Sequence, residues 1–81
     1  MKKDLRPEHE QLLIRIGKKV RDLRTADNLS YMSMAEQIGI SRNTYNMLEL
    51  GKLSFQFTTL LLVLEHHKIS LTDFFKDIEN L

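Results

Sequence analysis

The most suggestive chemistry in this sequence lies on a short polar face between residues 42 and 47. Arg42, Asn43, Asn46 and Met47 share that face if the segment is helical, because they occupy positions i, i+1, i+4 and i+5. Arginine can donate two parallel hydrogen bonds to guanine O6 and N7, and asparagine can pair with adenine N6 and N7. Methionine would pack on a thymine methyl group instead. Taken alone, however, these residues are better explained as an ordinary solvated helix face.

Other reactive side chains form no recognisable site. His66 and His67 are adjacent, and neighbouring helical positions point about 100° apart, so the two make a poor chelate for one metal ion. No acidic or cysteine residue accompanies them at ligand spacing. The chain also shows no nucleophile–base set, no glycine-rich phosphate loop and no paired catalytic carboxylates. We therefore expect no enzyme, no metal, no cofactor and no small-molecule ligand.

Length and composition indicate one small protein domain. The 81 residues are close to the minimum that folds without staples, and the absence of cysteine excludes disulfides and thiolate zinc sites. The net charge is only +1, so contact with a polyanion would need a local patch. No apolar run approaches the roughly 18 residues of a membrane span, and no apolar stretch follows the basic start. These features favour a cytoplasmic protein that contacts no membrane.

Apolar periodicity and helix-ending residues predict an all-α fold with no strand. Serines 30, 41 and 70 are the expected N-caps, while Asn28, Gly39 and Gly51 can take the conformation that ends helices. The domain should cover residues 8–81, behind a flexible basic tail at 1–7. The five helices are expected at residues 8–26, 31–38, 42–50, 57–67 and 71–79.

The apolar stripes also predict which side chains lie inside. In the first helix the inward set includes Leu12, and the fourth helix, apolar nearly all round, should lie at the centre of the domain. Phe57 is expected in the core. Leu53 and Phe55 stay open between the core and an exposed patch that meets a second subunit. The predicted inward residues of the first three helices are Leu12, Leu13, Ile16, Val20, Leu23, Met34, Ala35, Ile38, Tyr45 and Leu48.

The segment from residue 31 to residue 50 meets three requirements of a helix-turn-helix. Ala35 is small enough to stand where the two helices cross, and Gly39 tolerates the positive φ that the turn needs. Apolar anchors flank the turn and continue into the second helix. Together these conditions make a fairly specific signal. The anchors are Met34, Ile38, Ile40, Tyr45 and Leu48.

With this motif in place, the sequence resembles a known family. The run IGKKVRDLRTADNLSYMSMAEQIGISRNTYNMLELGK is similar to the phage-repressor and Cro-like helix-turn-helix family, often called Xre-type. The similarity covers about residues 14–76. It implies a compact five-helix, lambda-repressor-like DNA-binding domain. It further implies a sequence-specific DNA-binding transcriptional regulator of the repressor kind, acting on double-stranded DNA as a homodimer.

The resemblance assigns roles to particular residues. It places the face of Arg42, Asn43, Asn46 and Met47 in the major groove, as base contacts. It implies phosphate contacts from Tyr31, Ser41 and Lys52. Tyr31 replaces the family's usual glutamine, which braces the helix that carries the base contacts. A buried ion pair between Arg24 and Glu49 is implied as a scaffold feature that reads no DNA.

A different use of the same fold is also open. Near-neutral charge, together with Tyr31, Leu53 and Phe55, would suit a protein-interaction module such as an antitoxin-like partner of another protein. The apolar residues near the C-terminus either close the core or form a two-fold interface: Phe74, Phe75, Ile78 and Leu81.

Overall fold

The structure is a computed structural model that describes residues 6–52 and 55–79. These residues form five helices and no strand, which confirms the predicted all-α class. Each helix border lies within one residue of its prediction. None of the described helices is both long and apolar enough to cross a membrane. The helices are α1 (Pro7–Ala26), α2 (Tyr31–Ile38), α3 (Arg42–Glu49), α4 (Phe57–His67) and α5 (Leu71–Glu79).

Each of the first four helices is followed, within two residues of its end, by a residue with positive φ. In each case the next backbone N–H bonds to the carbonyl five residues back, as in a Schellman motif. Glycine takes this conformation at no steric cost, and the sequence predicts it at Gly39 and Gly51. Lys68 was not predicted, because lysine carries no such preference. The residues and their φ values are Asn28 (59°), Gly39 (78°), Gly51 (71°) and Lys68 (59°).

Three helices begin on the serines that the sequence predicts as N-caps. The hydroxyl oxygens of Ser30, Ser41 and Ser70 accept hydrogen bonds from backbone N–H groups three residues later, at 3.1, 3.0 and 3.0 Å. Each such cap contributes about 1 kcal/mol to helix stability. Local chemistry therefore fixes where α2, α3 and α5 start.

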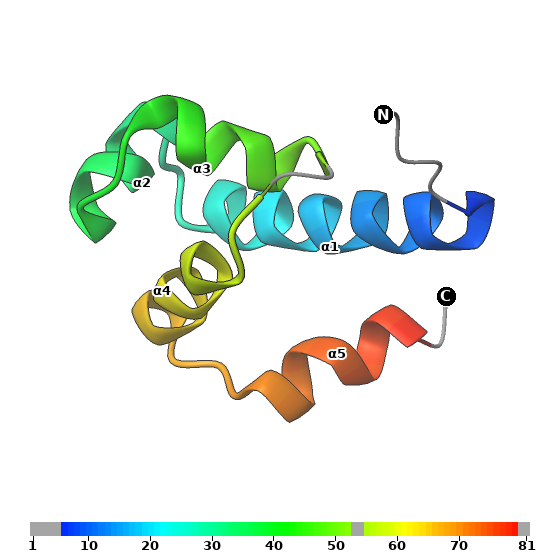
Figure 1. The fold of residues 1–81 in the computed structure, drawn as a ribbon. Coiled ribbons are helices and arrows are strands. Elements are labelled where there is room, and N and C mark those ends of the chain that lie inside the picture. The colour runs from blue at the N-terminus through cyan, green and yellow to red at the C-terminus, as the bar shows by residue number, and fades with distance from the viewer. Residues whose placement is uncertain (1–5, 53–54, 80–81) are drawn as a thin grey trace.

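The long helix α1 runs through the middle of the molecule (Figure 1). Helices α2 and α3 lie on one side of it, and α4 and α5 lie on the other (Figure 1). The core forms where the inner faces meet, and Val20, Tyr45, Leu60 and Phe74 are fully buried within it. The helix-turn-helix is thus held by its inner side against α1 and α4.

Helix α4 does not occupy the centre of the domain, contrary to the sequence-based prediction. Only one face is buried, and Phe57, expected in the core, is 52% exposed. Phe57 stands four positions before Leu61, which is also exposed, so the two share the outward face. The buried residues of α4 are Thr59, Leu60, Val63 and Leu64.

The structure also places two other apolar residues. Leu12, which was predicted to lie inside, is exposed, because the buried face of α1 begins only at Ile16. Phe55 is partly buried and packs on the core, which settles its position. Leu53, Leu81 and most of the predicted basic tail lie outside the described residues, whereas Arg6 is described and exposed.

Candidate nucleic-acid interface

Helix α3 has clearly different inner and outer sides. Tyr45, Leu48 and Glu49 are buried, whereas Arg42 and Asn43 are exposed. Asn46 and Met47 are half-buried. The outer edge of α3 is therefore open at its N-terminal end and partly covered further along.

The polar groups on this edge are only weakly engaged. The side-chain amide of Asn43 approaches the sulfur of Met47 at 3.9 Å, a weak hydrogen bond that a better acceptor would replace. The Arg42 side chain makes no hydrogen bond or ion pair with the described part of the chain. Arg42 and Asn43 are thus available to an external partner at little cost in lost contacts.

A hollow of about 540 Å³ opens between the first turns of α2 and α3. Ser30, Ser33, Ser41 and Arg42 line it, together with the carboxylate-bearing Glu36. The first-turn N–H groups of a helix that its cap leaves unsatisfied attract anions, as does the positive end of the helix dipole. The hollow therefore offers an anion three serine side chains and one guanidinium, with the Glu36 carboxylate as an unfavourable neighbour and the apolar Met32, Ala35 and Ile40 in the rest of the lining.

The three predicted phosphate contacts lie at different places around α3. Ser41 borders the hollow, and exposed Tyr31 is the first residue of α2, next to Ser30. Exposed Lys52 follows the other end of α3, where its backbone N–H bonds to the Met47 carbonyl at 3.0 Å. Ser41 and Arg42 therefore share one hollow, while Lys52 lies apart from them.

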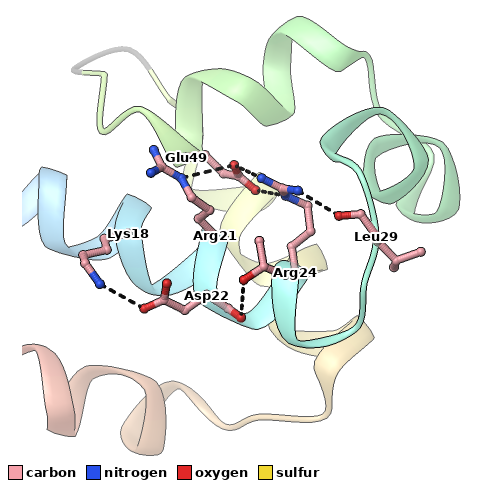
Figure 2. A network of polar contacts seen from close by, with 7 residues as sticks. Lys18, Arg21, Asp22, Arg24, Leu29 and Glu49 are labelled. Atoms are coloured by element: carbon pink, nitrogen blue, oxygen red, sulfur yellow. Dashed lines mark hydrogen bonds and ion pairs between the residues drawn. The ribbon is translucent and has the colours of Figure 1, made fainter.

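Arg24 and Glu49 point toward each other, Arg24 from α1 and Glu49 from the end of α3 (Figure 2). Arg24 Nε and Nη2 donate to the two Glu49 carboxylate oxygens at 2.7 and 3.0 Å, and Arg24 Nη1 donates to the Leu29 carbonyl at 2.8 Å. The Glu49 side chain is 4% exposed and that of Arg24 is 14% exposed. The hydrogen bond to Glu49 raises the pKa of Arg24 against the opposing effect of burial. This pair joins the end of α1, the α1–α2 connection and the end of α3.

Two further side chains, those of Arg21 and Tyr45, lie near this pair. Arg21 approaches it from α1, with Nε 3.9 Å from a Glu49 oxygen, although its side chain is half exposed (Figure 2). The Tyr45 ring lies buried nearby, and burial raises the pKa of its hydroxyl. Two arginine side chains of α1 therefore face the buried Glu49 carboxylate at the end of α3.

Gly17 permits α1 and α3 to approach closely, a role that the sequence analysis missed. A Cβ atom at this position would lie 2.3 Å from the Glu49 carbonyl oxygen and 2.7 Å from that of Leu48. The available signal was a glycine inside an otherwise helical pattern, which often marks close packing. This contact sets the depth at which α3 sits on α1.

The histidines at the end of α4 have an acidic neighbour that the sequence analysis did not expect. Asp27 Oδ2 lies 3.4 Å from His67 Nδ1, because the fold brings the end of α1 to the end of α4. Burial lowers the pKa of His67, His66 lowers it further, and Asp27 opposes the shift. No acidic residue stands at ligand spacing from the histidines in the sequence, but the fold brings Asp27 beside His67.

Comparison with known proteins places this arrangement in a family. A family model described as helix-turn-helix (HTH_3) matches residues 20–74, from the second half of α1 into α5. No curated protein and no solved structure matches the chain. The matched region contains α2, α3 and both partners of the Arg24–Glu49 pair. The chain therefore belongs to the helix-turn-helix family, which is a family of DNA-binding domains.

Proposed function

We propose that this protein is a sequence-specific DNA-binding transcriptional regulator, a repressor that reads the major groove with α3. The observation that carries the proposal is the exposed pair Arg42 and Asn43 at the open N-terminal end of α3. Members of this structural class dock the second helix of the motif with its N-terminal residues nearest the bases. Both side chains have the donors that guanine and adenine edges accept.

Phosphate contacts would hold this helix in register without reading sequence. Ser41 and the first-turn N–H groups of α3 would take one phosphate in the hollow shared with Arg42. Tyr31 would reach the same strand from the start of α2, and Lys52 would meet a phosphate beyond the other end of α3. The net charge of +1 makes these local groups the main electrostatic attraction.

A homodimer would place two copies of α3 on the two halves of one site. Two-fold binders of this class contact half-sites about one helical turn apart. Repression would then follow from occupancy of the site in the cytoplasm, with no cofactor and no small-molecule ligand.

Selection of bound duplexes from a random pool tests the proposal. A repeated half-site in the selected sequences, with a fixed spacing, is the expected result. Binding to the selected duplex should then fall steeply with salt, because each neutralised phosphate releases counterions. A pool that returns no sequence bound above random DNA would contradict the proposal.

An antitoxin-like protein-interaction module is the second candidate. Exposed apolar side chains on α2 and after α3 favour it, namely Tyr31, Met32 and Leu50. Phe55 no longer contributes to such a surface, because it packs on the core. The salt titration separates the two functions. Phosphate contacts make the affinity for duplex DNA fall steeply as salt rises, whereas a module that binds another protein requires no such dependence.

A further inference from the structure

Three potential metal ligands gather where the end of α1 meets the end of α4. Asp27, His66 and His67 each offer one ligand atom, and these atoms all lie within 4.8 Å of one another. Asp27 caps α1, while the two histidines are the last residues of α4. Almost forty residues separate the carboxylate from the imidazoles, so only the tertiary fold brings them together.

The backbone fixes this cluster from both sides. The Asp27 N–H bonds to the Arg24 carbonyl at 3.0 Å, which holds the residue at the end of α1. On α4, the positive-φ residue Lys68 ends the helix directly after His67. The two imidazole rings lie edge to face with their centroids 5.0 Å apart. This arrangement keeps both rings near the carboxylate although adjacent helical positions diverge.

The two ring nitrogens of His67 have different surroundings. Its side chain is only 6% exposed, and Nδ1 faces Asp27 at 3.4 Å. Its other ring nitrogen, Nε2, is buried and has no hydrogen-bond partner among the described residues. A metal ion bound between Nδ1 and Asp27 would replace the long contact between these two groups and would leave Nε2 unchanged, so Nδ1 is the nitrogen that bears on a metal site.

We propose that Asp27, His66 and His67 bind a divalent transition-metal ion, with Zn²⁺ as the best match. Two imidazoles and one carboxylate suit zinc, copper or nickel, whereas Mg²⁺ and Ca²⁺ prefer oxygen ligands alone. Three protein ligands around Zn²⁺ leave a fourth position for water. Asp27 is exposed and His66 half-buried, so the ion can enter from solvent.

Binding would require only a modest contraction of the cluster. Zinc–ligand bonds of about 2.0–2.1 Å place tetrahedral ligand atoms roughly 3.3 Å apart. The Asp27–His67 pair is already at 3.4 Å. The remaining adjustment falls on the other pairs, which lie within 4.8 Å. The ion would then tie the α1–α2 connection to α4, as a structural clamp that does not depend on the DNA-binding proposal.

The test uses the full chain without a histidine tag, stripped of metal by a chelator. Calorimetric titration with ZnCl₂ should show saturable binding of one ion, while MgCl₂ should show none. At a Zn²⁺ concentration a hundredfold above Kd, the Tm should rise by about 10 °C or more. With Co²⁺ as the probe, visible absorption bands should report imidazole and carboxylate ligation.

Matched variants locate the site. Asp27→Asn and His66→Gln should each weaken Zn²⁺ binding about tenfold or more. His9→Gln removes an exposed histidine at the start of α1 and should leave the affinity unchanged. Circular dichroism of the metal-free variants shows whether each one is folded. If either the Asp27 or the His66 variant has lost its fold, zinc binding by the other variant decides the test. The proposal is overturned if the natural protein shows no saturable binding, if the folded Asp27 or His66 variant binds normally, or if His9→Gln abolishes binding.

Discussion

The Glu49 carboxylate accepts two hydrogen bonds from the Arg24 guanidinium, which links the last residue of α3 to the last turn of α1. Arg24 simultaneously binds the carbonyl of Leu29, on the connection that leads into α2. One side chain therefore positions both helices of the motif relative to α1. Because the pair lies on the inner side, it orients α3 while leaving the outer edge open.

Replacement of Arg24 by methionine should destabilise the protein by about 3–5 kcal/mol. The reason is that Glu49, at 4% exposure, would lose its principal cation and remain buried. Urea denaturation measures the loss. Lys18→Met is the matched control, since the Lys18–Asp22 pair is exposed and such pairs contribute under about 1 kcal/mol. Equal losses for the two variants would show that the Arg24–Glu49 pair is no more important than a surface pair.

Gly17→Ala should destabilise the protein even though alanine favours helix. The helix preference is worth about 1 kcal/mol, but the new methyl group would collide with backbone carbonyls of α3 that cannot rotate away. Separation of α1 from α3 should cost about 1–3 kcal/mol net. Thermal unfolding provides the measurement. Gln11→Ala, at an exposed position of the same helix, should have little effect, and a stabilised Gly17→Ala protein would refute the close packing.

Phe57 and Leu60 should respond very differently to truncation. Phe57→Ala should cost under about 1 kcal/mol, because half of this side chain already faces water. Leu60→Ala should cost about 2–5 kcal/mol, because Leu60 is fully buried in the core. Denaturant titration of both variants gives the comparison. A loss at Phe57 as large as that at Leu60 would restore the earlier placement of Phe57 in the core.

Features that depend on neighbouring residues were predictable from the sequence. Ser30 and Gly39 begin and end α2 through bonds within a few residues, so their side-chain chemistry alone indicates the borders. The inner and outer sides of α3 also follow from its spacing, because polar and apolar residues alternate clearly around it. The DNA contacts of the outer side remain a prediction.

Features that depend on distant packing were not predictable in the same way. Helix α4 is apolar nearly all round, so periodicity could not identify Phe57 as an outward residue. Gly17 looks like a weak point in a helix until α3 is placed across it. The approach of Asp27 to His67 depends on the angle between α1 and α4, which local preferences do not determine.

Lys52→Ala should weaken binding to the selected duplex and to random DNA by the same factor. A phosphate contact carries no sequence information, so its loss should also reduce the slope of log K against log salt by about 1. Fluorescence anisotropy at several salt concentrations measures both effects. Lys76→Ala removes an exposed lysine from α5, on the other side of α1 from α3, and should change neither quantity (Figure 1). A loss restricted to the selected duplex would contradict the phosphate role of Lys52.

The most direct test of the account is the affinity of Arg42→Ala for the selected duplex and for random DNA, measured side by side. If the outer edge of α3 reads bases, affinity for the selected duplex should fall roughly five- to 150-fold, equivalent to about 1–3 kcal/mol. Affinity for random DNA should fall much less, because only one exposed charge is removed. Equal losses on the two DNAs would mean that Arg42 does not distinguish sequence, and base reading by α3 would be wrong.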